Sequence, residues 1–208
     1  MRVPSTSSIP VRRAPQQDRA TKRVEAFLGA AESLFVEQGY EGTTMTAVAE
    51  RAGSSIGALY SYFPDKMALA RALAAQYADA LGAYWEPEFE QLSGASAKKF
   101  ADRFLDSFLE FTAKQPAYWQ LQAAPVRFRR DPATRHAFRV VLQKALQGCA
   151  PQLDDARAYL CANTVLQITK GMVTLYVDSA PADRPRVVIE FKTVLSLYLK
   201  SVFAEKHS

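Results

Sequence analysis

The chain has only two cysteines and two histidines among its 208 residues. Cys149 and Cys161 cannot build the disulfide framework of a small secreted domain, and they belong to no metal-ligand motif. We expect both to act as small buried apolar residues, with a thiol switch as the alternative. No second catalytic group converges on His136 or His207. We therefore predict no metal site and no cofactor.

Long apolar runs are absent too. No segment approaches the roughly 20 consecutive apolar residues that a membrane-spanning helix needs. Residues 1–20 are polar, rich in proline and arginine, and lack the apolar core of a secretory signal. We expect cytoplasmic residence, most simply in a bacterium, and no membrane partner. A glycine-rich phosphate loop and a nucleophile–base pair are also missing, so we predict that the protein is not an enzyme.

Apolar side chains recur at helical spacing along most of the chain, without strand-like alternation or an internal repeat. The hydrophobic content of 49% is enough for a buried core. We predict an all-α protein of eight or nine helices. They are expected over residues 18–38, 44–52, 55–63, 97–114, 131–148, 154–177 and 186–205, with a long helix from 65, a short helix from 116 and a break at Ser93–Gly94 within the segment 87–96.

The stretch from Thr43 to Lys66 encodes two short helices joined by a tight turn. A helix of about eight residues, a glycine turn and a second short helix form a helix-turn-helix, whose second helix enters the major groove of DNA. Hydroxyl side chains stand where each helix needs an N-cap, and a glycine stands where the first helix ends. These residues are Thr44, Gly53 and Ser55, and the inward face comprises Met45, Val48, Ala49, Ala52, Leu59 and Phe63.

The outward side of the second short helix lacks acidic residues, so nothing there repels phosphate. Its small residues let the backbone approach the groove floor, and nearby tyrosine and lysine side chains can contact phosphates. We assign Phe63 to the core, whereas Tyr60 and Tyr62 could combine buried rings with exposed hydroxyls. We predict as DNA-binding residues Lys22, Arg23, Thr44, Thr46, Ser55, Ile56, Gly57, Ala58, Tyr60, Ser61, Tyr62 and Lys66.

The net charge of +5 is concentrated at the N-terminus. Residues 1–23 contain six basic residues and one acidic residue, and the remainder is electrically neutral. Proline, serine and glutamine dominate residues 1–17, so we predict a disordered basic arm there. The arm is interpreted as a DNA-seeking tail, with a solubilising terminus as the alternative.

The pattern TT…VAERAGSSIGALYSYFPDKMAL, preceded by an amphipathic helix ending in Gly39–Tyr40, resembles the DNA-binding domain of the TetR family of bacterial transcriptional regulators. The resemblance covers roughly residues 20–75. One departure is Ser54, where the family usually has an apolar residue. The resemblance implies a helix-turn-helix domain, expected at 18–66, followed by a helical ligand-binding and dimerisation domain at 67–208.

Two apolar stripes near the C-terminus predict a homodimer. The helix at 186–205 has apolar residues through four turns, and that at 154–177 has a similar stripe with Gly171 permitting close approach. Packing within one subunit is the alternative, but much of the apolar face of the helix at 186–205 would then remain exposed to solvent in a monomer. A four-helix interface between two subunits would cover it, as the family resemblance also implies. We predict interface positions at Phe191, Leu195, Tyr198, Leu199 and Val202.

Aromatic residues gather between residues 97 and 177. Each is individually more typical of a core, yet together they favour an apolar pocket for a hydrophobic or aromatic small molecule. Polar residues within the helix at 154–177 could orient the ligand. Arg127, Arg129 and Arg130 form a charge run that is usually solvated, although one could pair with an acidic ligand. We predict pocket residues at Phe104, Phe108, Phe111, Trp119, Tyr159, Asn163 and Gln167.

Together these features predict a homodimeric, ligand-responsive regulator, most often a repressor in the family that the chain resembles. It would bind a palindromic operator in duplex DNA and leave it when a hydrophobic small molecule binds. An activator or a ligand-independent regulator of the same fold is the first alternative. An α-helical enzyme or binding protein without DNA function is the second.

Overall fold

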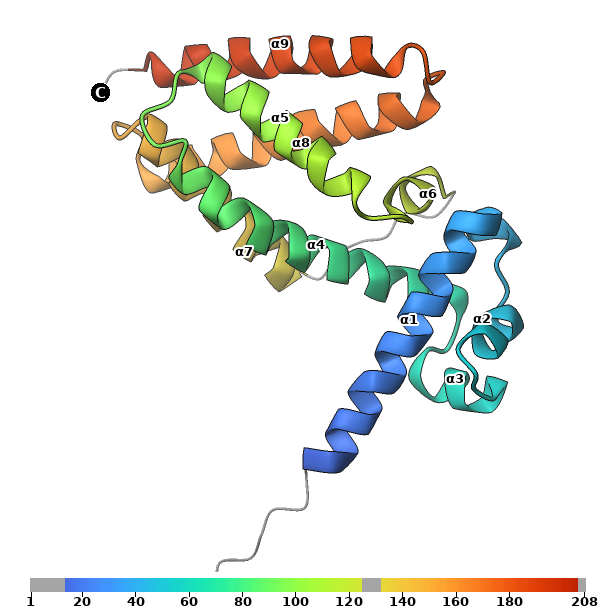
Figure 1. The fold of residues 1–208 in the computed structure, drawn as a ribbon. Helices are drawn as coiled ribbons and strands as arrows, with labels where there is room; N and C mark the ends of the chain where they lie inside the picture. The colour runs from blue at the N-terminus through green and yellow to red at the C-terminus, as the bar shows by residue number, and fades with distance from the viewer. Residues whose placement is uncertain (1–13, 125–131, 206–208) are drawn as a thin grey trace, which may run out of the picture.

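The computed structural model of the chain describes residues 14–124 and 132–205. This part of the chain contains nine helices and no strand (Figure 1). None of these helices is long and apolar enough to cross a membrane. The helices are α1 (Ala14–Gly42), α2 (Met45–Arg51), α3 (Ile56–Tyr62), α4 (Lys66–Glu90), α5 (Ala97–Ala113), α6 (Tyr118–Ala123), α7 (Pro132–Cys149), α8 (Asp155–Asp178) and α9 (Arg184–Phe203).

Helices α1 to α3 enclose a small core at the N-terminal end. The backbone of α1 leaves helical geometry at Gly39, with φ at +72°, a conformation that glycine adopts without steric cost. The expected stop at this residue is therefore present, although one further turn follows to Gly42. The side chains that fill the core are Phe27, Ala31, Leu34, Phe35, Val48, Ala49, Leu59 and Phe63.

Helix α1 begins at Ala14, four residues before the start that we predicted at Asp18. Residues 14–17, which we assigned to a disordered arm, are thus helical. The rest of that arm, residues 1–13, lies outside the described residues.

Helix α4 is the long connector between the two halves. It continues through Pro87 to Glu90, and the break that we predicted at Ser93–Gly94 follows it, with φ of Gly94 at +70°. A proline inside a helix removes one backbone hydrogen bond. The flanking Trp85 and Phe89 are buried in the aromatic core, and this packing offsets the loss.

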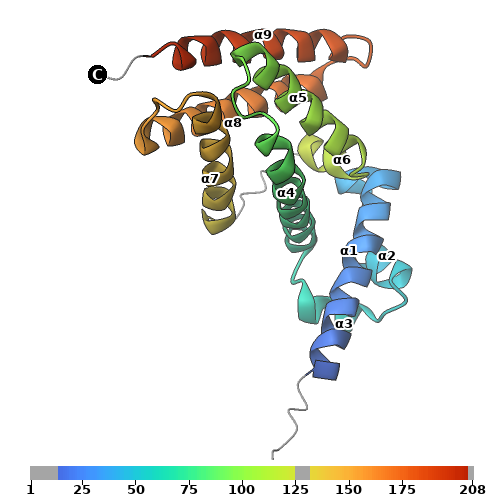
Figure 2. The same ribbon diagram turned by 60° about the vertical axis from the view of Figure 1, so that its left-hand side comes forward.

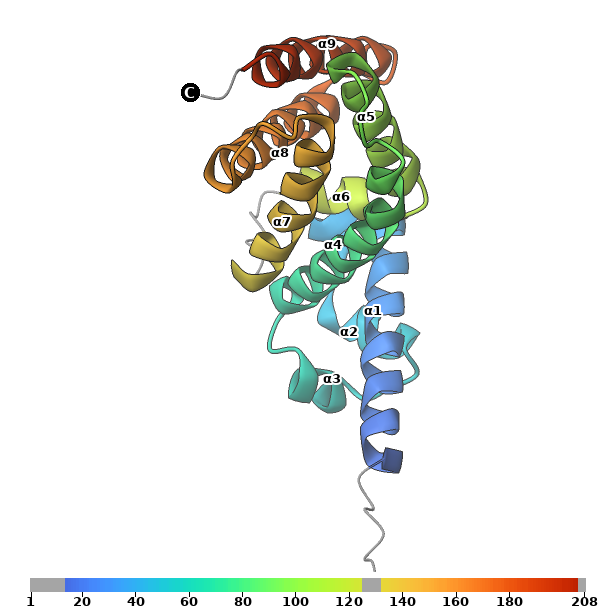
Figure 3. The same ribbon diagram turned by 90° about the vertical axis from the view of Figure 1, so that its left-hand side faces the viewer.

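In the C-terminal half, α9 packs on both α8 and α5 (Figures 1 and 2). Helix α7 packs on α8 and α4, and α6 lies between this half and the C-terminal part of α1. In Figure 3, α9 lies at one end of the molecule and α3 with the start of α1 at the other. The domain that could bind ligand is thus joined to the helix-turn-helix through α4 and α6.

Candidate nucleic-acid interface and ligand pocket

Both predicted N-caps hold the helix-turn-helix together. The Thr44 hydroxyl oxygen accepts a hydrogen bond from the Ala47 amide at 3.1 Å, and that of Ser55 accepts one from the Ala58 amide at 3.2 Å. Gly53 turns the chain between them with φ at +61°. These contacts satisfy amides that the helix itself leaves unpaired. The two hydroxyls therefore position α2 and α3, whatever else they contact.

Several α3 residues that we predicted to face DNA are on the surface. Ile56 is 38% exposed and Tyr60 is 51% exposed. Gly57 is exposed, and a side chain at this position would meet no atom within 4 Å. Together they form an outward face free of carboxylates, which a phosphate backbone can approach.

Other predicted contacts face inward or are already engaged. Ala58 is half-buried, and the Ser61 hydroxyl donates to the Ala58 carbonyl at 2.6 Å. The Tyr62 ring lies 5.8 Å from that of Phe27, so it closes the small core while staying half-exposed. Of the two tyrosines, Tyr60 is the one that presents its ring to solvent.

The structure gives Lys66 a role within the fold. Its ammonium donates to the Tyr40 carbonyl at 2.6 Å and to the Glu41 carbonyl at 3.1 Å, and it lies 4.6 Å from the centre of the Tyr40 ring. These groups end α1, where the helix dipole favours a cation. This lysine therefore holds the start of α4 against α1, and the phosphate contact that we predicted for it stays a prediction. Burial of Tyr40 in this arrangement raises the pKa of its hydroxyl.

An ion pair that sequence reasoning missed fixes α2 against α1. Two guanidinium nitrogens of Arg51 donate to the two carboxylate oxygens of Glu37, both at 2.8 Å. These hydrogen bonds hold the pKa of Glu37 below its usual value. The residues are 14 positions apart in two different helices, so no helical spacing signals the pair.

The remaining predicted DNA contacts are exposed. Lys22 and Arg23 project from α1, and Thr46 lies on the surface of α2. Figure 1 places the first half of α1 at the same end of the molecule as α3. This arrangement lets α1 contribute positive charge beside the recognition helix.

The aromatic residues of α5 form a core with Trp85 of α4. Phe104 lies 4.7 Å from Trp85 and Phe108 lies 6.1 Å from it, measured between ring centres. Phe104, Phe108 and Phe111 are almost fully buried. The alternative of a large-residue core thus describes them better than the predicted ligand pocket does.

The polar candidates on α8 have partners or face outward. Asn163 accepts a hydrogen bond from Arg139 and donates to the Tyr159 carbonyl. The Tyr159 hydroxyl lies 3.1 Å from Nδ1 of His136. Gln167 is exposed on the outer face of α8. The arginine run at 127–130 lies outside the described residues.

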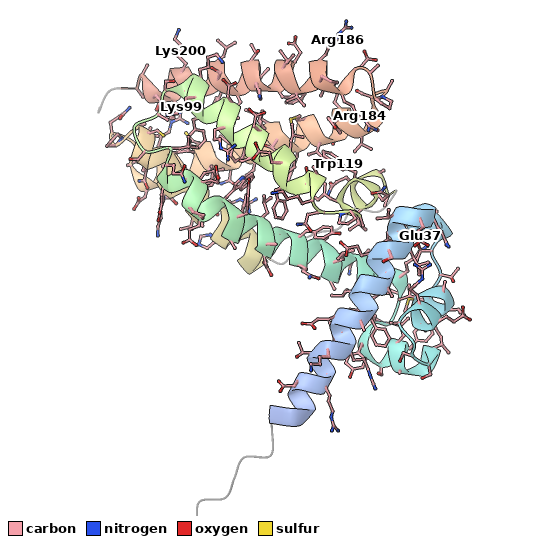
Figure 4. The ribbon with its side chains drawn as sticks, viewed as in Figure 1. Glu37, Lys99, Trp119, Arg184, Arg186 and Lys200 are labelled. Atoms are coloured by element: carbon pink, nitrogen blue, oxygen red, sulfur yellow. The ribbon has the colours of Figure 1, made fainter. Side chains whose placement is uncertain are left out.

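A pocket does exist where α6 meets the end of α8 and the start of α9 (Figure 4). Its volume is about 260 Å³. Of the seven residues that we predicted for a pocket, Trp119 alone lines this one. Its lining residues are Trp119, Gln120, Ala123, Tyr176, Val177 and Arg184.

Three of the predicted interface residues belong to the core of a single subunit. Leu195, Leu199 and Val202 are fully buried, because this side of α9 packs against α5 and α8. We therefore predicted the wrong side of α9 for these three positions. Phe191 and Tyr198 are half-buried, and the Phe191 ring packs over Gly171 of α8.

A different apolar stripe is exposed on the outer faces of α8 and α9. Each of its residues is about half or more exposed in the single chain. We call them the outer stripe: Leu160 and Leu175 on α8, and Ile189, Val194 and Leu197 on α9.

A hydroxyl links the two halves of the molecule. Tyr77 of α4 donates a hydrogen bond to the Glu32 carboxylate of α1, and its oxygen accepts one from the Ala117 amide at 3.3 Å. Burial, followed by the bond to Glu32, raises the pKa of Tyr77. One side chain thus joins α1, α4 and the start of α6.

Within the described ranges, no cluster of three or more histidine, cysteine, aspartate or glutamate side chains could hold a metal ion. Cys161 is buried, and the Cys149 thiol is half-buried and donates to the Leu92 carbonyl at 2.9 Å. Burial raises the pKa of Cys149, which disfavours the reactive thiolate.

Two family descriptions match separate parts of the chain. "Bacterial regulatory proteins, tetR family" matches residues 27–73, and "Tetracyclin repressor-like, C-terminal domain" matches residues 98–199. The chain is also 39% identical over 66 residues to the HTH-type transcriptional repressor AcnR of Corynebacterium glutamicum. That match covers 30% of this chain and 35% of the repressor.

Solved structures share the whole architecture. A TetR-family transcriptional regulator from Streptomyces coelicolor superposes with a TM-score of 0.66 at 23% identity, over 86% of this chain and 99% of that one. A TetR transcriptional regulator from Rhodococcus sp. RHA1 gives a TM-score of 0.61 at 20% identity, over 91% of this chain and 100% of that one. At these identities the likeness establishes the fold.

Proposed function

The chain belongs to the TetR family of bacterial transcriptional regulators, and we propose that it is a homodimeric repressor that a small molecule releases from a palindromic operator. The observation that carries the proposal is the outward face of α3, where Ile56, Gly57 and Tyr60 stand exposed on a doubly capped helix-turn-helix.

Recognition would use the surface of α3 and its surroundings. Gly57 lets the backbone approach the groove floor, and Ile56 offers an apolar contact for a thymine methyl group. The Tyr60 hydroxyl and the cations of Lys22 and Arg23 would contact phosphates, which position the helix without reading sequence.

Dimerisation would use the outer stripe. A row of exposed apolar side chains on two adjacent helices can be covered by the same row of a second subunit around a two-fold axis. A C2 dimer of this kind presents two α3 helices to two half-sites, so the operator would be a palindrome.

The effector would act through the junction between the halves. It would bind the C-terminal domain more tightly in the conformation that does not fit DNA, and only this difference in affinity shifts the equilibrium. We place the complex in the cytoplasm, where the operator is accessible.

Selection of bound sequences from a random duplex pool tests the function directly. We expect the enriched sequences to form a palindrome. The affinity should fall steeply as salt rises, because the lysine and arginine side chains of the protein release counterions from the DNA phosphates on binding, and added salt opposes this release. The matched control is Gly57→Glu, which puts a carboxylate on the outward face and should abolish enrichment while leaving the helical fold intact. A wild-type protein that enriches no sequence and shows no salt dependence would not be a DNA-binding regulator.

A further inference from the structure

We propose that the pocket between α6, α8 and α9 binds a flat aromatic anion, such as an aromatic carboxylate. This inference names the effector class and therefore rests on the proposed ligand response. It places the ligand away from the α5 aromatic core, on a separate set of side chains.

Two of the lining residues form an aromatic stack. The rings of Trp119 and Tyr176 lie 4.5 Å apart at an interplanar angle of 26°. A planar ring system can extend such a stack on the Trp119 side, because the guanidinium of Arg184 lies over Tyr176. The volume of about 260 Å³ is slightly below the range of about 300–1,000 Å³ typical of drug-sized ligands, so the pocket suits a ligand of one or two rings.

A guanidinium supplies positive charge at the same place. Arg184 lies over the Tyr176 ring, with its central carbon 5.0 Å from the ring centre, and its Nε donates to the Tyr176 carbonyl at 3.2 Å. None of the ion pairs formed among the described residues involves Arg184. Its terminal nitrogens are thus positioned for a carboxylate, which arginine binds in bidentate fashion.

The aromatic and the charged lining residues come from different helices. Trp119 lies on α6, and Arg184 is the first residue of α9. Figure 4 shows Arg184 and Trp119 on neighbouring elements at this end of the domain.

The pocket connects to the DNA-binding half through continuous contacts. Trp119 packs edge-to-face on Tyr118 with ring centres 5.1 Å apart, and Tyr118 lies 6.5 Å from the ring of Tyr77. Tyr77 bonds Glu32 of α1, and α6 itself packs on α1. A ligand that shifts Trp119 would therefore act on α1 through α6 as well as through α4.

The chain offers an internal reporter for the test. Its two tryptophans are Trp85, buried in the core, and Trp119, in the pocket. In a Trp85→Phe variant, fluorescence would report the pocket alone. We would titrate it with 4-hydroxybenzoate and the neutral 4-hydroxybenzamide, and follow 4-aminobenzoate and indole-3-acetate, which fluoresce themselves, by calorimetry. At least one anion should quench Trp119 saturably and bind more tightly than the neutral amide. Calorimetry on the unmodified protein repeats the test without relying on Trp85→Phe.

Arginine variants provide the decisive comparison. Arg184→Gln should weaken binding of the anion by about tenfold or more, the loss expected for a charged hydrogen bond. The matched control is Arg186→Gln, because Arg186 projects from the same helix, is 86% exposed and lies outside the pocket lining (Figure 4). It should leave affinity within about twofold, as expected of an exposed side chain.

The outcomes separate the pocket from the repressor function. If no anion in the panel binds at millimolar concentration, or if Arg184→Gln binds as tightly as Arg186→Gln, the assignment is wrong. Binding is measured without DNA, so a protein that fails to bind an operator would refute the proposed function and leave this result standing. Loss of operator affinity in the presence of the bound anion would support both.

Discussion

Leu195 and Leu197 lie two residues apart on α9 and face opposite ways. Leu195 is fully buried inside its own subunit, whereas Leu197 is 63% exposed. One side of α9 therefore packs into the core of its own subunit, and the opposite side exposes apolar side chains to solvent.

Replacing both Ile189 and Leu197 with glutamate should convert the dimer to a monomer without unfolding it. Four carboxylates would have to be buried across the two-fold interface, at a cost that exceeds any compensation there. Sedimentation velocity would measure the change. As a control, Val36→Glu changes an exposed apolar residue on α1 and should leave the dimer intact. A folded double variant that still sediments as a dimer would refute the outer stripe as the interface.

Lys66→Ala should lower stability and leave the salt dependence of DNA binding unchanged. The variant loses two hydrogen bonds to carbonyls of α1, so the free energy of unfolding should fall by about 1–3 kcal/mol. Lys22→Ala should do the reverse, reducing the salt slope by about one unit without loss of stability. Denaturant titration and binding at several salt concentrations measure both quantities. A lower slope with intact stability for Lys66→Ala would restore the phosphate contact that we first predicted.

Ile56→Ser should relax specificity at one position of each operator half-site. The variant would lose an apolar contact with a thymine methyl, and discrimination there should drop by about 1 kcal/mol or more. Selection of bound sequences with the variant measures this. Ser61→Ala is the matched control on the same helix, because the Ser61 hydroxyl is already bonded to the Ala58 carbonyl. An unchanged binding motif for Ile56→Ser would place base recognition elsewhere, for example at Thr46.

Tyr77→Phe should destabilise the protein by about 1 kcal/mol at neutral pH, through loss of the bond to Glu32. The pKa of Tyr77 is raised in the folded state, so the folded chain keeps a proton that the unfolded chain releases above about pH 10. The contribution of Tyr77 is therefore complete below pH 10 and declines as pH rises further. Thermal melts of both proteins between pH 7 and about 11 measure the gap, which should narrow in alkali. A gap that widens would contradict this sign.

Local patterns predicted most of the fold. The caps at Thr44 and Ser55 and the turn at Gly53 depend on neighbours within four residues, and all three are present. The starts of α5 and α8 were likewise predicted within a residue, because serine and aspartate mark them. Pro87 stays inside α4, because aromatic packing overrides the helix-breaking tendency of proline there.

The site was predicted less completely because it depends on contacts between distant segments. Periodicity identifies two apolar faces on α9 but does not say which one meets α5, so Leu195 was assigned to the wrong partner. The ammonium of Lys66 donates to carbonyls 25 and 26 positions away in the chain, and no sequence pattern predicts these two hydrogen bonds. Trp119 was predicted as a pocket residue because it is aromatic. Arg184 could be assigned to the pocket only from the structure, because a loop brings it back over the Tyr176 ring.

The lock formed by Lys66 also decides where the molecule could be divided for engineering. A chimaera that joins this DNA-reading unit to a foreign sensor would normally be cut at the first residue of α4. A cut before Lys66 would leave the Tyr40 and Glu41 carbonyls without their cation. The transplantable unit therefore extends past the recognition helix into the first turn of α4, and the splice belongs beyond it.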